Sequence, residues 1–129
     1  MISTKGRYAL RVMLDLAEHE GCSTLKDIAE RQEISKKYLE IIVKTMVQGG
    51  LIAGTSGKGG GYRLVREPKD YPVGEILEMM EGSLAAVACL EQNAEPCPRA
   101  SICRTLPLWA EYNRMTHDFF YNKRLSDLL

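Results

Sequence analysis

Five glycines within eight residues, at positions 54–61, constrain the fold of this sequence more than any other feature. Two short runs that include apolar residues, 51–53 and 62–65, flank this segment. Glycines at such density break helices and adopt turn conformations that other residues avoid. We therefore predict a β-hairpin with a long, glycine-rich tip. Because a strand and not a helix follows the glycines, the segment does not match a nucleotide-binding loop.

Three helices are predicted before this hairpin. The first runs from about residue 4 to residue 18, and its apolar residues occupy more than one face, which indicates burial on two sides. Thr24 opens a short second helix, and Ser35 is a suitable N-cap for a third helix that ends at Gly49. Two short helices joined by a brief turn and followed by a hairpin are typical of a winged helix-turn-helix.

A short helix, an irregular loop and a long helix are predicted after the hairpin. The short helix ends at Gly82, and residues 83–102 show no sustained periodicity. The long helix starts near Cys103, and its broad apolar face consists of one stripe, Leu106, Trp109, Asn113, Thr116 and Phe120, and a neighbouring group, Tyr112, Met115 and Phe119. So small a chain offers too little partner surface for this face, and we therefore expect a homodimer.

The predicted fold class is mainly α with a small β-hairpin wing: a winged helix-turn-helix followed by a long C-terminal dimerisation helix. We assign residues 1–66 to DNA binding, with the first helix also near the dimer interface, and residues 67–129 to a cysteine loop and dimerisation region. Residues 1–65 carry 10 Lys and Arg against 7 Asp and Glu, whereas residues 66–129 carry 7 against 10. The basic half therefore matches the DNA-binding half.

The location of the protein is predicted from its apolar segments. No apolar run reaches the roughly 18 residues of a membrane span. The first residues are polar and lack the apolar core of a signal peptide. We therefore expect a cytoplasmic protein without a membrane partner.

The residues expected to contact double-stranded DNA lie at the start of the third helix and in the wing. In a helix-turn-helix, the second helix enters the major groove with its N-terminal residues. Lysines and hydroxyls there hold phosphates, and the carboxylate of Glu40 is suited to accept from a cytosine amino group. The wing glycines let the backbone approach the duplex, and Lys58 adds a positive charge. The predicted contacts are Ser35, Lys36, Lys37, Tyr38, Glu40 and Lys44 in the helix, and Ser56, Lys58, Gly59 and Gly60 in the wing.

Three of the four cysteines, Cys89, Cys97 and Cys103, lie within fifteen residues. Structural disulfides are not expected in a chain without an export signal. Thiolates are soft ligands suited to iron–sulfur centres, and the spacing is too wide for a zinc knuckle. Nearby Arg99 and Arg104 favour the thiolate form. Three interpretations stay open: an iron–sulfur cluster, [2Fe–2S] in preference to [4Fe–4S]; thiol-based sensing without a cluster; or small apolar side chains without a chemical role.

The sequence resembles the Rrf2 family of bacterial regulators over essentially its whole length. The resemblance is carried by Ser-Thr-Lys-Gly-Arg-Tyr-Ala-Leu at 3–10, Ile-Ser-Lys-Lys-Tyr-Leu-Glu at 34–40 and Gly-Gly-Gly-Tyr at 59–62. It continues from Thr-Leu-Pro-Leu-Trp at 105–109 to the closing residues 125–128. The resemblance implies a homodimer with crossed C-terminal helices on a palindromic or pseudo-palindromic operator. It also implies that Ser35, Tyr38 and Glu40 contact DNA.

This resemblance further implies that the three clustered cysteines are cluster ligands, although the sequence departs from the family in four places. The gap between Cys89 and Cys97 is two residues longer, and Leu106 stands where the cluster-assembly regulators carry a histidine. Arg7 stands where other relatives supply an acidic ligand, and Ser56 where the wing carries an arginine. The fourth ligand is therefore unassigned. The candidates are Glu91, Glu95, Cys22 or an exogenous small molecule.

The sequence thus predicts a dimeric DNA-binding transcriptional regulator, of repressor type, that senses iron–sulfur or redox status through Cys89, Cys97 and Cys103. Two alternatives remain: a cluster-free thiol regulator, and a repressor controlled by a partner protein, as among the cysteine-metabolism repressors of the family. An enzyme is not expected. The sequence offers no Ser/His/Asp set, no phosphate loop and no paired carboxylates suited to catalysis.

Overall fold

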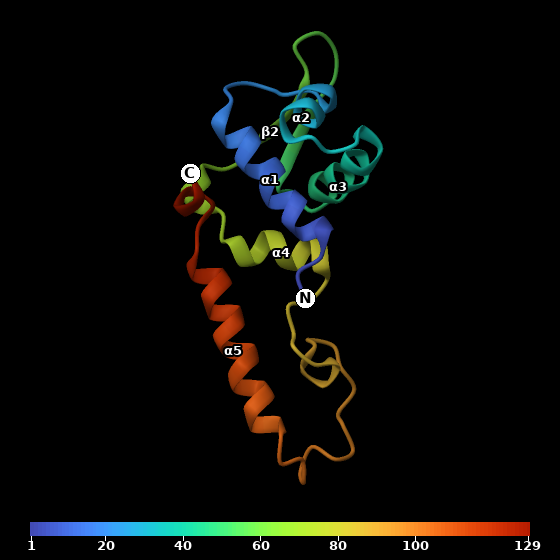
Figure 1. Cartoon of the computed structure of the whole chain (residues 1–129), viewed down its shortest axis with the longest axis vertical. Coiled ribbons are helices and arrows are strands. Elements are labelled where there is room, and N and C mark those ends of the chain that lie inside the picture. Colours follow the sequence, from blue (N-terminus) through green and yellow to red (C-terminus); the bar gives the residue numbers. More distant parts are fainter.

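The computed structural model describes all 129 residues as a helical body, a hairpin and one projecting helix (Figure 1). The α-helices are α1 (Thr4–Glu18), α2 (Leu25–Gln32), α3 (Lys36–Gln48), α4 (Val73–Glu81) and α5 (Leu106–Asn122). The antiparallel strands are β1 (Ile52–Thr55) and β2 (Gly61–Leu64), and the 3-10 turns are η1 (Pro68–Asp70), η2 (Ala88–Leu90) and η3 (Leu125–Leu128). None of the helices combines the length and apolarity needed to cross a bilayer.

The three predicted N-terminal helices begin where their capping residues place them. The side chains of Ser3, Thr24 and Ser35 each accept a hydrogen bond from the backbone N–H three residues on, at 3.1 to 3.3 Å. Each cap satisfies one of the N–H groups that a helix start leaves without a partner. The hairpin is confirmed too, with Ile52 opposite Leu64 and Thr55 opposite Gly61.

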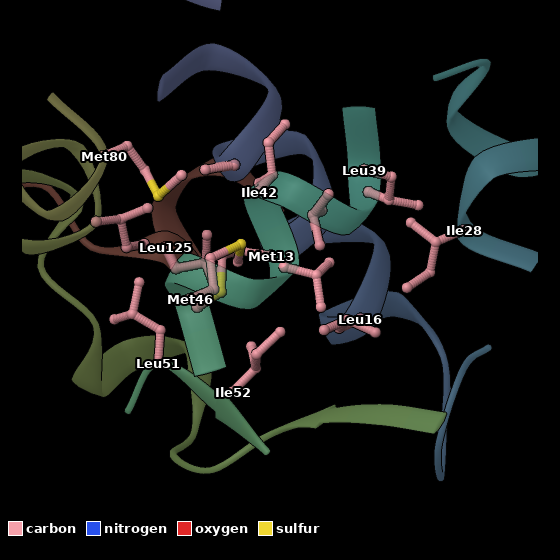
Figure 2. Packing of buried hydrophobic residues seen from close by; sticks show 14 of the residues in the cluster. Met13, Leu16, Ile28, Leu39, Ile42, Met46, Leu51, Ile52, Met80 and Leu125 are labelled. Atoms are coloured by element: carbon pink, nitrogen blue, oxygen red, sulfur yellow. The ribbon is translucent and has the colours of Figure 1, made fainter. Parts of the chain in front are cut away.

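One hydrophobic core of 16 buried residues joins both halves of the chain. Figure 2 shows Met80 of α4 and Leu125 of η3 packed with Met46 of α3 and Leu51 at the base of the hairpin. Tyr71 is fully buried, and its hydroxyl donates to the carbonyl of Leu51 at 2.8 Å. The second half of the chain is thereby attached to the hairpin. The division of roles at residue 66 stays a prediction.

The last helix differs from its prediction in where it starts and in which residues face outward. α5 begins at Leu106, three residues after Cys103, and none of its residues is buried. Asn113, Thr116 and Phe120, placed by the sequence on the main apolar stripe, are half-buried and lean toward the chain's own loop. The large apolar side chains that α5 exposes are Leu108, Trp109, Tyr112, Met115 and Phe119. We call this set the α5 face.

Candidate nucleic-acid interface and cysteine loop

A groove of about 770 Å³ lies between α3 and the hairpin. Lys36, Glu40 and Lys44 line its α3 side, because a spacing of four residues places side chains on the same helix face. Ser56 of the hairpin lines the opposite side, and Lys26 of α2 contributes a further ammonium group. Three lysines against one carboxylate make the groove positive, as a surface for a phosphate backbone requires.

The other predicted residues of α3 lie outside this groove. Lys37 is exposed, whereas Tyr38 is half-buried and packs edge-on against Tyr8 of α1, with ring centroids 5.8 Å apart. Ser35 uses its hydroxyl oxygen to cap α3, so its hydroxyl hydrogen remains free to donate. Of the six residues predicted at α3, Lys36, Glu40 and Lys44 therefore follow the side that faces the hairpin. Ser35, Lys37 and Tyr38 lie at the N-terminal end of the helix, where Tyr38 packs against α1.

The hairpin tip can be built only with glycine at its narrowest point. The backbone N–H of Gly60 donates to the carbonyl of Gly57 at 3.0 Å, and a Cβ at Gly60 would overlap the carbonyl of Thr55. Lys58 and Gly59 are exposed at this tip. Figure 1 shows the tip projecting beyond α2, at the opposite end of the molecule from the start of α5.

Two residues of this surface were missed by the sequence interpretation. Ile41 is 51% exposed, although an isoleucine in an amphipathic helix is usually buried. The available signal is its place outside the stripe of Leu39, Ile42, Val43 and Met46, all of which are buried. An exposed apolar side chain on a helix predicted to enter the major groove is suited to contact a thymine methyl group. Lys26 was missed because a lysine in the first turn of a helix is common.

The turn between α2 and α3 is held by α1. Glu33, at the end of α2, adopts a left-handed conformation with φ of 54°, which is unusual for a residue other than glycine. Arg11 of α1 donates to the backbone carbonyl of Gln32 and to its side-chain oxygen, and its guanidinium lies 4.9 Å from the centre of the Tyr8 ring. Arg11 therefore satisfies a free carbonyl at the end of α2 and supports Tyr8 beneath Tyr38.

A buried carboxylate lies beside this turn, and we expect the stability of the protein to depend on its charge. Burial raises the pKa of Asp15, but hydrogen bonds from Arg31 and Gln32 and the charge of Arg31 outweigh burial, so the pKa lies below its ordinary value of 3.8. A carboxylate whose pKa is lowered by folding stabilises the folded protein. This stabilisation is complete when the pH is above the pKa of the unfolded state, and it is lost as the pH falls through the pKa of the folded state.

Asp15→Asn should therefore lower the unfolding free energy by about 2 kcal/mol at neutral pH. It should also flatten the dependence of that free energy on pH below about pH 4. Urea denaturation at a series of pH values measures both effects. Asp70→Asn, at an exposed position, is the control and keeps the slope of the parent. An Asp15→Asn variant with the parent's slope would contradict the role given to this carboxylate.

The three clustered cysteines are free and accessible, but the structure does not gather them. Cys89 and Cys97 are exposed, and Cys103 is half-buried close to the start of α5. A hydrogen bond with the Thr105 hydroxyl, backbone N–H groups of Thr105 and Leu106 and the charge of Arg99 lower the pKa of Cys103. The donor set suits an iron–sulfur centre chemically, since three thiols with one favoured as thiolate are soft ligands. Nowhere do three His, Cys, Asp or Glu side chains stand close enough to hold one metal.

Cys89 lines a hollow of about 840 Å³ between the cysteine loop, α4 and α5. Two of the candidate fourth ligands, Glu91 and Glu95, line the same hollow, as does His117 of α5. Glu78 lines it too, but its carboxylate accepts a hydrogen bond from the Tyr121 hydroxyl. Burial and this bond raise the pKa of Tyr121 to about 12.

The remaining residues considered for the cluster lie elsewhere. Cys22 is half-buried next to Ser23, which pairs with the hairpin strand β2 at Tyr62. The guanidinium of Arg7 donates to the Thr4 hydroxyl on its own helix. Among the candidates for the fourth ligand, the structure therefore brings only Glu91 and Glu95 together with a cluster cysteine.

Comparison with known proteins identifies the family. A sequence model of the Rrf2 family, described as iron-dependent transcriptional regulators, matches residues 2–129. The regulator IscR of Pectobacterium atrosepticum is 38% identical over 130 residues, covering 99% of this chain and 78% of the relative. Among solved structures, CymR, the global cysteine regulator of B. subtilis, superimposes with a TM-score of 0.78 at 35% identity, covering 99% of this chain and 95% of that chain.

A second solved structure, IscR of T. potens, has a TM-score of 0.77 and 33% identity, and it covers 99% of this chain and 85% of that chain. These proteins are regulators and not enzymes, which agrees with the prediction of a transcriptional regulator. The predicted winged helix-turn-helix, mainly helical with a two-stranded wing, is confirmed as well. The chain belongs to the Rrf2 family of transcriptional regulators.

Proposed function

We propose that this protein is a homodimeric, repressor-type regulator that binds a two-fold symmetric operator in the cytoplasm and responds to iron–sulfur or redox status through Cys89, Cys97 and Cys103. The observation that carries the DNA-binding part is the positive groove in which Lys36, Glu40 and Lys44 of α3 face the hairpin. In this proposal, α3 enters the major groove while the wing follows the neighbouring backbone.

Each residue of the interface has a role suited to its chemistry. Lys36, Lys37 and Lys44 hold phosphates, and Ser35 adds a hydroxyl donor. Glu40 forms no ion pair within the chain, so its carboxylate is free to accept from a base amino group. In the wing, Lys58 supplies the positive charge that Ser56 lacks, and the backbone at Gly59 and Gly60 approaches the duplex closely.

The dimer is proposed from the α5 face. Five large apolar side chains on one helix are more than 35% exposed each, which is unusual for a surface without a partner. A second copy placed by a two-fold axis would cover this face with the same residues. Two copies of α3 would then be presented to the two halves of a palindromic operator.

The sensing part is proposed from the cysteine loop. Three free thiols and the likeness to IscR favour an iron–sulfur cluster, [2Fe–2S] in preference to [4Fe–4S]. Because the cysteines are not gathered, the loop must rearrange before all three bind one group. The lowered pKa of Cys103 favours a second candidate, thiol-based redox sensing without a cluster.

Binding to operator DNA tests the proposed interface. Lys36→Ala should weaken binding to every sequence and reduce the dependence of log K on log salt by about one unit. Glu40→Ala should instead relax the choice at one base pair by about 1–3 kcal/mol. Fluorescence anisotropy with operator and scrambled duplexes over a salt series measures both effects. Lys69→Ala, outside the interface, serves as control; equal losses for Glu40→Ala on all sequences would contradict base reading by Glu40.

A further inference from the structure

The wing is attached to the body by a single backbone pairing away from its own hairpin. The N–H of Ser23 donates to the carbonyl of Tyr62 at 2.9 Å, and the N–H of Tyr62 donates to the carbonyl of Ser23 at 2.7 Å. The backbone segments at Ser23 and Tyr62 lie very close together. A Cβ at Gly61, where φ is +136°, would overlap the Ser23 carbonyl. Ser23 lies just before α2, so this pairing joins the wing to the helix-turn-helix.

A chain of charged hydrogen bonds holds Ser23 from the other side. The Arg31 guanidinium donates to the Ser23 hydroxyl at 2.8 Å and to both carboxylate oxygens of Asp15, at 2.7 and 3.0 Å. Asp15 and Ser23 are 1% and 4% exposed, so both acceptors are shielded from water, whereas the Arg31 side chain is 32% exposed. Hydrogen bonds between ionised partners are stronger than neutral ones, and a two-bond pair fixes direction as well as distance.

The same carboxylate also holds the end of α2. The Gln32 side chain donates to Asp15 at 3.0 Å, and Gln32 in turn accepts from Arg11, which supports Tyr8 beneath Tyr38. Asp15 is therefore the point at which the supports of the wing and of the recognition helix α3 meet.

We propose that Asp15 and Arg31 are positioning residues for DNA binding, which fix the wing against α2 so that Lys58 and α3 reach the duplex at the same time. The inference rests on the proposed function, because it assumes that the wing touches DNA. Asp15 is too deeply buried to contact DNA itself, so its effect on binding must pass through other residues.

A double-mutant cycle between Arg31 and Lys58 tests the proposal. Arg31→Gln alone should weaken operator binding roughly tenfold and reduce the salt slope by about one unit, and Lys58→Ala should do the same. Combined with Arg31→Gln, Lys58→Ala should then cost less than about twofold, because a wing out of position has no contact left to lose. Additive losses would overturn the proposal, since they would mean that Arg31 contacts DNA directly or acts elsewhere.

The controls separate positioning from a general loss of stability. Glu75→Gln breaks a similar pair, in which Arg66 donates to the two Glu75 oxygens at 2.7 and 2.8 Å. Glu75 belongs to α4, so this pair does not contact Ser23 or α2. Its effect on operator binding should be small and additive with Lys58→Ala. Ser23→Ala removes only the hydroxyl link and keeps the Asp15–Arg31 pair. In this milder variant, the loss of operator binding caused by Lys58→Ala should also be smaller than in the parent, but by less than in Arg31→Gln.

Amide hydrogen exchange provides a measurement that does not depend on DNA. Residues 52–64 should exchange faster in Arg31→Gln and in Ser23→Ala than in Glu75→Gln, because local opening of the wing becomes easier. Unchanged exchange in this segment would overturn the proposal even if DNA binding fell. If Lys58→Ala and Lys36→Ala both bind like the parent, the proposed DNA interface is wrong. Faster exchange in residues 52–64 would then show that Asp15 and Arg31 hold the wing in place, but that the wing does not take part in DNA binding.

Discussion

Met115→Asp should convert the protein from a dimer to a monomer and abolish tight operator binding. Met115 is 63% exposed in the single chain and lies within the α5 face, between Tyr112 and Phe119. In a two-fold interface, one substitution places two carboxylates in apolar surroundings. A cost of about 3 kcal/mol raises the dissociation constant of the dimer roughly a hundredfold, and a larger cost raises it further.

Operator binding should fall with the dimer because each monomer contacts only one half-site. Sedimentation velocity at micromolar concentration measures the oligomeric state, and anisotropy with full and half operators measures binding. Arg114→Asp introduces the same side chain on the flank of α5, away from the α5 face, and should remain dimeric. A Met115→Asp protein that stays dimeric would place the interface elsewhere.

Loss of iron from three single variants is the second large effect that we expect. Protein purified without oxygen should be coloured and contain iron and sulfide, and Cys89→Ala, Cys97→Ala and Cys103→Ala should each lose most of both. The physical reason is that a cluster with only two thiolates from this loop is exposed and weakly held. Cys22→Ala is the control and should keep its iron, because Cys22 lies outside the cysteine loop, next to the residue that pairs with β2.

The same samples decide between the two sensing candidates. If the bound cluster favours one arrangement of the dimer, operator affinity should differ about 5- to 150-fold between loaded and stripped protein. Colourless parent protein from cells that assemble clusters would exclude the cluster and leave the thiol switch. Iron retained equally in all three variants would show that these cysteines are not the ligands.

The start of each helix-turn-helix element could be predicted because local chemistry determines it. Ser3, Thr24 and Ser35 act within three residues of themselves, and the glycines of the hairpin tip meet a local steric demand. The outward side of α5 could not be predicted, because its two apolar stripes differ only in what the rest of the chain covers. Ile41 was missed for a different reason: it lies outside the buried stripe of α3, but an isoleucine in an amphipathic helix is usually buried.

The arrangement of the cysteines was also beyond the sequence. The sequence indicated that three thiols lie in one loop and that Cys103 lies near the start of the long helix, but not that Cys89 lines a hollow with Glu91. Nor did the sequence mark Glu33 as left-handed, since the end of α2 next to it is held by Arg11 of α1, which donates to Gln32. Long-range contacts decide each of these features.

The projection of α5 places the Cys103 end of the cysteine loop farther from the proposed DNA interface than a charge can act. α5 has 17 residues and is therefore roughly 25 Å long, and Cys103 lies three residues before its start. Figure 1 shows the start of α5 at the opposite end of the molecule from the hairpin tip. Physiological salt screens charges beyond about 8 Å, so a new charge in the loop exerts almost no force on the phosphates. If the loop controls DNA binding as proposed, its effect must therefore pass through a movement of packed elements. One such element is α4, which ends at Glu81, whose carboxylate accepts from the N–H and the hydroxyl of Ser3 at 2.8 and 2.7 Å. The loop begins just after Glu81 and α1 just after Ser3, so this contact joins the start of the loop directly to the start of α1.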